Sequence, residues 1–476
     1  MQKMHHTMQD NTGYHWGNKR VVVAGLARSG VAAAHLLLLA GAQPILWDTK
    51  TKEELRSQEI DQLIEKGCEL IAGHTPESAL MHADVLIVSP GIPLDAAIII
   101  QAIAQDVPVL GELELGARFV RGPLYAVTGT NGKTTTVTLL GEILRQAGRV
   151  VHVCGNIGHP LSAAVAQGKE DDVYVVEVSS FQLETVQHFH PTIAAVLNIT
   201  PDHLNRHGSL ARYAALKGSI FSRQTTGDIA VLNAEDPLVF AMRDGLQGRV
   251  AMFSKTDWGY EGAFVRDGML MLRWDDVEQQ VCAVEEIRIP GAHNLENALA
   301  ATTIAGIAGV PPAVIRYALR SFAGVEHRIE FVREVAGVWY INDSKGTNPD
   351  ATIKAVEAMR VPTILLAGGV DKQIPFDRLA EVIQNSGMVR HVIVYGQTAH
   401  AIERALRLAG YGDVEHRTNM QAAFDRAHEL ATHGFNVLLS PACASFDQFS
   451  DYEERGRRFK ELVNQLHEPP TGGTNG

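Results

Sequence analysis

A glycine-rich turn with a lysine and two threonines, Gly129-Thr-Asn-Gly-Lys-Thr-Thr135, has the residue types that bind a nucleoside triphosphate. Glycines let the backbone approach phosphate oxygens, Lys133 supplies a positive charge, and the Thr134 hydroxyl can ligate Mg²⁺. An apolar run, Tyr125–Val127, precedes the turn and a helical pattern follows it, which is the context in which a helix N-terminus binds phosphate. Val127 stands where the usual P-loop pattern has its first glycine. We predict an ATP site, against the alternative of an ordinary turn with a surface lysine.

A second glycine turn, Gly25-Leu-Ala-Arg-Ser-Gly30, resembles the dinucleotide-binding pattern with Ala27 in place of the middle glycine. Asp48 ends the next predicted strand, about 20 residues on, where a carboxylate could bind a ribose hydroxyl. Ala27 restricts how closely a pyrophosphate can approach the turn. The pattern favours a Rossmann-like domain that holds a nucleotide, and a tight turn without a ligand is the alternative.

Three more candidates follow the phosphate loop along the chain. Glu177 comes near the end of the apolar strand VYVVE, where it could hold Mg²⁺ or form an ordinary salt bridge. The segment Pro201-Asp-His-Leu-Asn-Arg-His207 follows the strand TIAAVLNIT and could bind metal, although short histidine-bearing loops often have no ligand. Lys217 lies on a predicted helix and by itself has the pattern of a surface lysine.

The elements that must position these residues form three blocks, each beginning with a strand-like run that leads into a turn and a helical pattern. Such alternation predicts parallel sheets with crossover helices. Turn residues cluster at Arg121–Pro123 and at Ser321–Val325. We therefore predict an α/β protein with a Rossmann-like domain (residues 1–121), a central P-loop ATPase-like parallel-sheet domain (122–325) and a C-terminal Rossmann-like domain (326–476).

Composition limits the class of protein. The chain has 476 residues, 46% hydrophobic and 20% charged, and its formal net charge of −12 argues against a nucleic-acid surface. No apolar run has the length of a signal peptide core at the N-terminus or of a membrane span, and the four cysteines form no C-x-x-C pair. We expect a cytoplasmic protein without membrane insertion, whose last residues, EPPTGGTNG, form a frayed tail.

Taken together, the segments resemble the Mur ligases of peptidoglycan synthesis, and among them the D-glutamate-adding branch. The resemblance extends from about Val21 to Phe459. Its motifs occur in the order GTNGKTT, GNIG, EVSSFQLE, NITPDHLNRH, YAALK, GAHNLENALAA, HRIE, NDSKGTNP, GGVDK and SPACASFDQFSDYEERG. SSFQLE and SPACASFDQF are the motifs most specific to the D-glutamate-adding branch.

The resemblance implies an ATP-dependent ligase that phosphorylates the L-alanine carboxylate of UDP-N-acetylmuramoyl-L-alanine. The amine of D-glutamate then attacks the acyl phosphate, and a tetrahedral intermediate releases phosphate. Lys133, His203 and Lys217 would be catalytic, and a monomer is expected. Two Mg²⁺ ions are implied, with Lys217 carbamylated so that it becomes an anionic ligand. The implied metal ligands are Thr134, Glu177, His203 and carbamylated Lys217.

The resemblance also assigns residues to three substrates. For ATP it implies Gly129, Thr130, Asn131, Gly132, Lys133, Thr134, Thr135, Asn297, Arg328 and Asp343. For the uridine nucleotide substrate it implies Ser29, Asp48, Thr49, Gly91 and Asn156, so the N-terminal turn is expected to bind UDP rather than a dinucleotide. For D-glutamate it implies Lys345, Thr347, Lys372, Ser445 and Tyr452. Asn205 stands where the family often has aspartate, and we leave it out of the catalytic set.

Three rival functions remain open at this point. A sister ligase would add another amino acid, such as L-alanine, or would add glutamate to folate. An oxidoreductase would use the turn Gly25–Gly30 for a nicotinamide nucleotide. A nucleotide-regulated binding protein would use ATP only to change shape, and it would not need the second metal arrangement that Glu177, His203 and Lys217 suggest.

Overall fold

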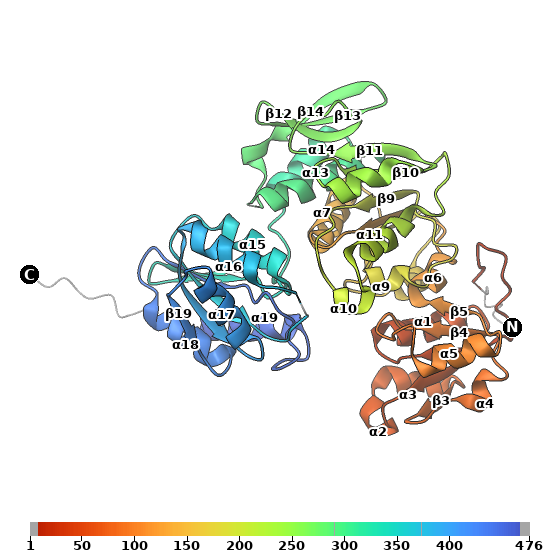
Figure 1. Ribbon diagram of the computed structural model, residues 1–476. Coiled ribbons are helices and arrows are strands. Elements are labelled where there is room, and N and C mark those ends of the chain that lie inside the picture. Colours follow the sequence, from red (N-terminus) through yellow and green to blue (C-terminus); the bar gives the residue numbers. More distant parts are fainter. Residues whose placement is uncertain (1–7, 290, 373, 467–476) are drawn as a thin grey trace, which may run out of the picture. The chain divides into compact units, whose positions relative to one another are not determined.

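The computed structural model describes residues 8–289, 291–372 and 374–466, without the side chain of Asn205; the predicted frayed tail from Glu468 onward lies outside these residues. The chain packs into two compact units (Figure 1). The first unit comprises residues up to Ile199, Ala214–Ile287 and Glu296–Ser321. The second comprises Thr200–Tyr213, Arg288–Leu295 and the residues from Phe322 onward.

The N-terminal part of the first unit is a five-stranded parallel sheet with the strand order β3-β2-β1-β4-β5. Its strands are β1 (Arg20–Ala24), β2 (Gln43–Asp48), β3 (Glu69–Ala72), β4 (Val85–Val88) and β5 (Val109–Gly111). The helices are α1 (Arg28–Leu39), α2 (Lys52–Leu55), α3 (Gln58–Glu65), α4 (Glu77–Leu80), α5 (Ala97–Ala104) and α6 (Glu112–Ala117). Strand order reverses between β1 and β4, and ligands bind at such a point outside the carboxyl ends of the strands.

The second sheet of the first unit has six parallel strands in the order β11-β10-β9-β6-β8-β7. They are β6 (Leu124–Thr128), β7 (Val151–Gly155), β8 (Val173–Glu177), β9 (Ile193–Val196), β10 (Ile229–Asn233) and β11 (Arg249–Phe253). Strands β6, β8 and β9 are neighbours, and each is buried along its whole length. The loops that follow these three strands therefore meet at one edge of the sheet.

One or two α-helices lie in each connection between strands that are consecutive along the chain in this sheet, and two more follow Ala283. The first of the pair between β9 and β10 belongs to the second unit. The helices between Lys133 and Ser321 are α7 (Lys133–Gln146), α8 (Leu161–Gln167), α9 (Ser180–Leu183), α10 (Leu204–His207), α11 (Leu210–Gly218), α12 (Pro237–Phe240), α13 (Ala292–Ile307) and α14 (Pro312–Ser321).

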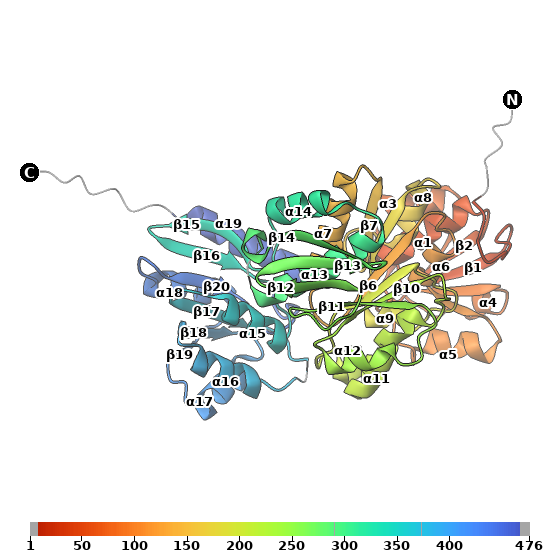
Figure 2. The ribbon, with the colours of Figure 1, turned by 90° about the horizontal axis from the view of Figure 1, so that it is seen from above.

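A small antiparallel sheet was not predicted from the sequence. It consists of β12 (Gly262–Arg266), β13 (Met269–Trp274) and β14 (Val277–Ala283), with β13 in the centre. It lies beside β11 and packs against α14 (Figure 2). One of its faces carries exposed ion pairs, such as Arg266 with Glu278. The sheet is an appendage to the nucleotide-binding fold and holds none of the candidate residues.

The second unit contains a six-stranded sheet in the order β15-β16-β20-β17-β18-β19. The strands are β15 (Glu330–Val335), β16 (Val338–Asn342), β17 (Thr363–Gly368), β18 (Val389–Tyr395), β19 (Val414–His416) and β20 (Asn436–Leu439). The helices are α15 (Pro349–Ala358), α16 (Asp377–Ser386), α17 (Ala399–Leu408), α18 (Met420–Leu430) and α19 (Tyr452–Gln465). The predicted parallel α/β arrangement is confirmed except at the edge, where β15 pairs antiparallel with β16.

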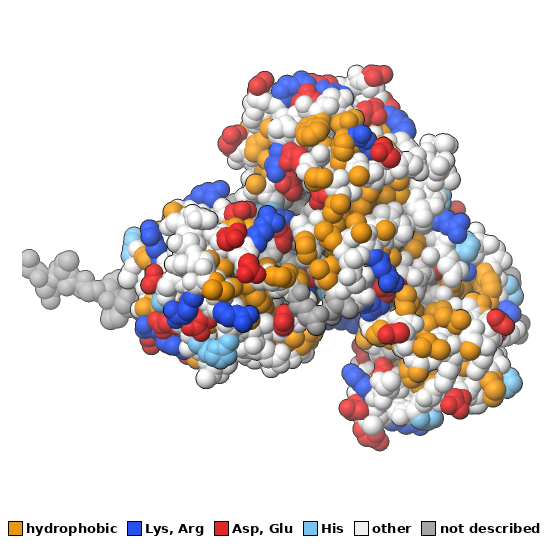
Figure 3. All heavy atoms as spheres, viewed as in Figure 1, with side chains coloured by type: hydrophobic (Ala, Val, Ile, Leu, Met, Phe, Trp, Pro, Cys, Tyr) orange, Lys and Arg blue, Asp and Glu red, His pale blue; other side chains and the backbone are white. Residues whose placement is uncertain are grey.

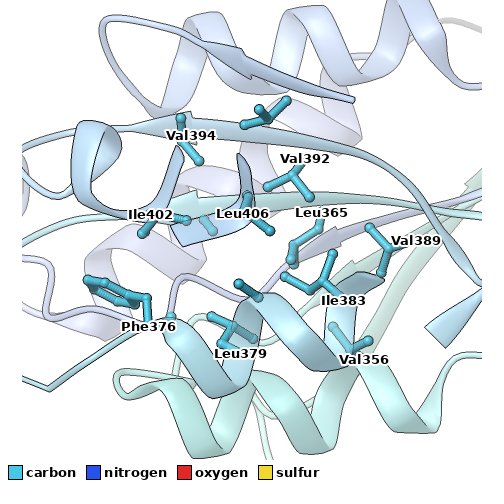
Figure 4. Close-up of a cluster of buried hydrophobic side chains, with 14 of the residues drawn as sticks. Val356, Leu365, Phe376, Leu379, Ile383, Val389, Val392, Val394, Ile402 and Leu406 are labelled. Atoms are coloured by element: carbon cyan, nitrogen blue, oxygen red, sulfur yellow. The ribbon is translucent and has the colours of Figure 1, made fainter. Parts of the chain in front are cut away.

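The core of the second unit explains why its strands are runs of apolar residues. Side chains from β17 and β18, among them Leu365 and Val392, pack against Leu379 and Ile383 of α16 and Leu406 of α17 (Figure 4). Both faces of the sheet carry such clusters. A sheet covered on both faces needs apolar residues on both sides of each strand.

The surface agrees with the composition of the chain. Acidic and basic side chains are interspersed over the face shown in Figure 3. Among the described residues, no helix is both long and apolar enough to cross a bilayer.

Candidate active site

The loop between β6 and α7 has the backbone geometry of a phosphate-binding turn. Gly129 and Gly132 have φ values of 151° and 87°, a region that residues with a side chain rarely adopt. The 14-residue helix α7 begins at Lys133, so its unpaired backbone N–H groups face the loop. The Lys133 ammonium donates to the carbonyl oxygens of Gly129 (2.8 Å) and Thr130 (2.7 Å). The predicted lysine thus lies over the loop that would surround the phosphates.

Asn198, which sequence reasoning missed, holds this loop in place. Its Oδ1 accepts from the backbone N–H of Asn131 at 2.8 Å, and its Nδ2 donates to the Asn131 carbonyl at 3.1 Å. Its own carbonyl accepts from the N–H of Thr130 at 2.9 Å. Asn198 is 9% exposed and follows β9, the neighbour of β6. The asparagine of the NIT segment was visible in the sequence, but its partner depends on strand order.

Glu177 ends β8 beside the phosphate loop and is 2% exposed. Its Oε2 accepts from the Thr134 hydroxyl at 2.7 Å, and its Oε1 accepts from Asn156 Nδ2 at 3.0 Å. The backbone N–H of Asn156 also donates to the Glu177 carbonyl at 2.8 Å. The structure therefore brings three predicted residues, from two strand ends and a helix, into one group that offers oxygen atoms as metal ligands. Such ligands are those that Mg²⁺ prefers.

Lys217, on α11, is 1% exposed, so its interpretation as a surface lysine is wrong. Its ammonium donates to the Gly129 carbonyl at 2.8 Å and approaches the Thr128 hydroxyl at 3.4 Å. Lysine is rarely this buried, because its charged form loses hydration. A buried lysine directly under the phosphate loop is a functional candidate.

Asn297, on α13, contacts the other side of the loop and is 4% exposed. A Cβ atom added at Gly132 would lie 2.2 Å from its Oδ1, which also accepts from the Thr136 hydroxyl at 3.4 Å. The side chain of Thr135 is buried at the start of α7. Asn297 therefore lies against the phosphate loop, where the resemblance places it for ATP.

The N-terminal turn also has a defined geometry. Gly25 has a φ of 83°, and a Cβ atom at Gly30 would lie 1.9 Å from the Gly25 carbonyl oxygen, so α1 can approach the turn only with glycine there. Asp48 braces the turn, because its Oδ2 accepts from the Leu26 N–H at 2.8 Å. Ser89, which sequence reasoning missed, donates to the Gly25 carbonyl at 2.7 Å.

Of the remaining residues assigned to the uridine nucleotide, three lie at the same edge of the N-terminal sheet, whereas Asn156 lies after β7 of the second sheet, where it contacts Glu177. Ser29 is half-buried in the first turn of α1, and Thr49 and Gly91 are exposed in the loops after β2 and β4. The carboxyl ends of β1, β2 and β4 thus present these three residues together.

In the second unit, Asp343 follows β16 and is fully buried. Its Oδ2 accepts from the Ser440 hydroxyl at 2.7 Å, its Oδ1 accepts from the Ile329 N–H at 3.2 Å, and Arg328 lies 3.9 Å away. Burial raises the pKa of Asp343 to about 6, while Arg328 acts in the opposite direction. The structure brings together the two residues of this unit that were assigned to ATP.

The residues assigned to D-glutamate lie in the loops after β16, β17 and β20, which are neighbours in the sheet, except Tyr452, which begins α19. Lys345 donates to the Tyr452 hydroxyl at 2.9 Å and lies 4.8 Å from the centre of that ring. Lys372 approaches the Thr347 hydroxyl at 3.4 Å. Ser445 is buried in the loop after β20. Because parallel strands end at one edge, residues that are 107 positions apart in sequence, such as Lys345 and Tyr452, come into contact.

Arg455, which sequence reasoning also missed, joins the loops after β16 and β20 by hydrogen bonds. It is 1% exposed and donates to Ser344 (2.9 Å to Oγ, 2.8 Å to the carbonyl) and to the Cys443 carbonyl (3.2 Å). It is the arginine within the SFDQFSDYEERG segment, and nothing local distinguishes it from a surface arginine of α19.

His203 belongs to the second unit and occupies the N-cap position of the short helix α10 with a φ of 51°. It follows the buried Asp202, whose Oδ2 is 3.7 Å from its Nε2. A separate group of possible metal ligands consists of Glu326, His327 and Glu330, whose ligand atoms all lie within 4.8 Å of one another. Lys460 bridges its two carboxylates at 2.8 and 2.6 Å, and we therefore assign no metal to it.

Comparison with known families decides which class of enzyme this arrangement belongs to. Residues 19–111 match the Mur ligase MurD-like N-terminal domain, residues 127–305 the Mur ligase middle domain, and residues 327–443 the Mur ligase glutamate ligase domain. The chain belongs to the Mur ligase family. The family predicted from the motifs and the predicted three-domain α/β fold are thus confirmed.

Individual Mur ligases are similar over nearly the whole chain. The UDP-N-acetylmuramoylalanine–D-glutamate ligase of Pelotomaculum thermopropionicum is 46% identical over 448 residues, which is 94% of this chain and 98% of that protein. The enzyme of the same name from Thermoanaerobacter sp. (strain X514) is 43% identical over 450 residues, with the same coverage of both chains.

Solved structures of Mur ligases and related proteins share the fold. A pseudomurein peptide ligase type C from Methanothermus fervidus has a TM-score of 0.60 at 20% identity, covering 94% of this chain and all of that one. MurF from Acinetobacter baumannii has a TM-score of 0.61 at 18% identity, covering 93% of both chains. These distant Mur ligase-like structures bear on the fold alone.

Proposed function

We propose that this Mur ligase joins D-glutamate to UDP-N-acetylmuramoyl-L-alanine with cleavage of ATP to ADP and phosphate, in peptidoglycan precursor synthesis. The observation that carries the proposal is the identity of 41–46% over 94% of the chain with ligases of that name. The buried group around the phosphate loop supports it, because it has the residues that an ATP-dependent ligase needs. The four cysteines are buried free thiols, which supports the cytoplasm as the compartment. We propose a monomer.

The reaction must turn a poor electrophile into a good one. An amine does not attack the carbon of a carboxylate readily, because that carbon is a poor electrophile. The L-alanine carboxylate oxygen therefore first attacks the γ-phosphorus of ATP, and ADP leaves. The amine nitrogen of D-glutamate then attacks the acyl carbon, and the tetrahedral intermediate expels phosphate and loses a proton to give the amide. Lys133 and the N–H groups at the start of α7 stabilise the negative charge of the transferred phosphoryl group.

Glu177 and Thr134 fit a Mg²⁺ ion, because a buried carboxylate and a hydroxyl 2.7 Å apart offer oxygen ligands next to the phosphate loop. When bound there, Mg²⁺ would neutralise phosphate charge during phosphoryl transfer. Asn156 orients the Glu177 carboxylate by donating a hydrogen bond to Oε1, the oxygen that Thr134 does not contact. A second Mg²⁺ would be held by His203 and by Lys217 as its carbamate.

The burial of Lys217 fits carbamylation. A lysine can react with carbon dioxide only in its neutral form, and burial favours the neutral form of an amine. Its 1% exposure and its contacts with the loop carbonyl and the Thr128 hydroxyl support a role inside the site rather than on the surface. We propose that the carbamate supplies the negative oxygen ligand that the native ammonium cannot.

The second unit is proposed to bind the amino acid. Lys345 and Lys372 carry the two positive charges for the two carboxylates of D-glutamate, and Thr347, Ser445 and Tyr452 supply hydroxyl groups. Arg328 and Asp343 are proposed to contact ATP. In the first unit, the turn at Gly25 with Ser29, Asp48, Thr49 and Gly91, together with Asn156, is proposed to bind the uridine nucleotide substrate.

The test is the mass of the product formed from ATP, UDP-N-acetylmuramoyl-L-alanine and D-glutamate. We expect the substrate mass plus one glutamyl residue, with one ADP released per product. The Lys133→Ala variant should form neither. Product from L-alanine with the unextended nucleotide, or from glutamate with a folate, would replace this function with that of a sister ligase.

The rivals from other classes make different predictions in the same assay. A nucleotide-regulated binding protein would release no ADP with any of these substrates. An oxidoreductase would bind a nicotinamide nucleotide at the N-terminal turn; that region instead matches the MurD-like N-terminal domain of the Mur ligases.

A further inference from the structure

A buried aspartate with no assigned role, Asp202, lies among the residues proposed to bind D-glutamate. It belongs to the segment Thr200–Tyr213, which packs as part of the second unit. Its side chain is 8% exposed. Burying a carboxylate costs free energy unless charges and hydrogen bonds compensate.

Asn348 fixes the orientation of this carboxylate. The Asn348 side chain caps α15, because its Oδ1 accepts from the Ala351 N–H at 2.8 Å. That contact leaves its Nδ2 to donate to Asp202 Oδ2 at 3.1 Å. Since the helix cap determines which atom of the amide points outward, Asn348 presents a donor and requires an acceptor at the Asp202 position.

Asp202 also touches a lysine of the proposed amino-acid site. Its Oδ1 lies 3.5 Å from the Lys372 ammonium, and that ammonium is 3.4 Å from the Thr347 hydroxyl. Its Oδ1 accepts from the His203 backbone N–H at 2.9 Å as well. Both contacts of Lys372 are longer than a typical charge-assisted hydrogen bond, so the lysine can turn to a substrate carboxylate at little cost.

The charges of this group match those of a free amino acid with two carboxylates. Lys345 and Lys372 are positive and Asp202 is negative, whereas D-glutamate has two carboxylates and one ammonium. We propose that Asp202 is a substrate-binding residue that receives the ammonium group of D-glutamate. The inference rests on the proposed function, since it takes the two lysines as the carboxylate-binding groups. It explains how the site distinguishes an amino acid from a plain dicarboxylate.

The experiment compares D-glutamate with glutarate, which has both carboxylates and no ammonium. In the wild-type enzyme, glutarate should inhibit competitively but bind more weakly than D-glutamate, by about 10-fold or more. Asp202→Asn should raise the KM for D-glutamate by a similar factor, leave the inhibition constant of glutarate unchanged, and change the KM for ATP by less than about 2-fold. The variant should therefore no longer distinguish the two ligands.

Asp350→Asn is the matched control. Asp350 also binds this segment, through the Thr200 hydroxyl at 3.3 Å, and it pairs with Lys354 at 3.2 Å. The Asp350→Asn substitution should change neither the KM for D-glutamate nor the inhibition constant of glutarate. Thermal melting should show that both variants fold. If Asp202→Asn weakens glutarate and D-glutamate equally, Asp202 only orders Lys372 and the proposal is wrong.

A second carboxylate near the site offers a competing assignment. Glu453 accepts from the Tyr452 hydroxyl at 3.2 Å and is half-buried. If Glu453→Gln, rather than Asp202→Asn, abolishes the distinction between the two ligands, the ammonium is bound there and the proposal is wrong. Failure of the wild-type enzyme to form any product with D-glutamate would instead contradict the proposed function, and so the two failures are distinguishable.

Discussion

The ammonium of Lys217 donates a 2.8 Å hydrogen bond to the carbonyl oxygen of Gly129, the first residue of the phosphate loop. The helix that carries Lys217 therefore approaches the loop closely enough to exclude water from that nitrogen. A lysine that looks unremarkable in sequence is tied to the backbone that would hold the nucleotide.

Replacing Lys217 with alanine should lower the rate of ligation about 100-fold or more, because it removes the proposed anionic ligand from the phosphoryl-transfer site. Added short-chain carboxylic acids should restore part of the rate by placing a carboxylate in the vacated space. The measurement is ADP release with all three substrates. Lys66→Ala, at an exposed lysine of the same unit, is the control and should be silent. Unchanged turnover in Lys217→Ala would remove the carbamate from the mechanism.

Gly132→Ala should abolish ATP binding, because the new methyl group would lie 2.2 Å from Asn297 Oδ1. Gly148→Ala is the matched control: Gly148 has a φ of 81°, close to the 87° of Gly132, but it faces open space. Both variants should lose about 1 kcal/mol of stability from the left-handed backbone. Nucleotide titration should show loss of affinity in Gly132→Ala alone. Equal affinities would mean that Asn297 moves aside freely.

Asn198→Ala should raise the KM for ATP by about 10-fold or more, because it removes both side-chain hydrogen bonds to Asn131. The effect should appear as a binding defect, with the KM for D-glutamate unchanged. Asn436→Ala makes the same change at another buried asparagine, in β20 of the second unit. That control should lower the melting temperature without changing the KM for ATP. A parallel loss of stability in both variants and no change in KM would show that Asn198 only stabilises the fold.

The sequence predicted those parts of the fold whose signal is local. The apolar runs that became β1, β6, β8, β16 and β17 lie between glycine turns and helical patterns, and each of them is a strand. The small sheet β12–β14 was missed because its strands mix exposed and buried residues: the first four residues of β14, Val277–Gln280, are all exposed. Such a strand has no apolar run, and it is stable only beside its partners.

The candidate site shows the same limit at the level of single residues. The phosphate loop was predictable because seven consecutive residues, Gly129–Thr135, determine its backbone geometry and its charge. The burial of Lys217 was not, since it depends on how α11 packs under the loop. The roles of Asn198 and Arg455 depend on strand order and on contacts across more than 60 and 100 positions of sequence, respectively. The motifs supplied the residues proposed to bind the substrates, whereas the residues that hold them in place could be identified only from the fold.

Glu112, on α6, gives a prediction about pH that is independent of the catalytic residues. It is 1% exposed, and its Oε1 accepts from the Ser162 N–H at 2.8 Å. Burial raises its pKa from an ordinary 4.5 to about 7, although the bonds from Ser162 act in the opposite direction. Between pH 4.5 and 7 the unfolded chain therefore binds fewer protons than the folded one at this group. Its contribution to stability must fall as the pH rises through that window and stay constant above it.

Glu112→Gln keeps an acceptor for the Ser162 N–H and cannot ionise. Relative to the wild type, the free energy of unfolding of the variant should increase from pH 4.5 to pH 7, by a total on the order of 3 kcal/mol, and then level off. Urea denaturation at half-unit pH intervals measures this difference, and Glu65→Gln at the exposed end of α3 should show no such trend. A difference that is the same at every pH would mean that Glu112 ionises in the folded protein as readily as in the unfolded chain, for example because water reaches its carboxylate between α6 and α8.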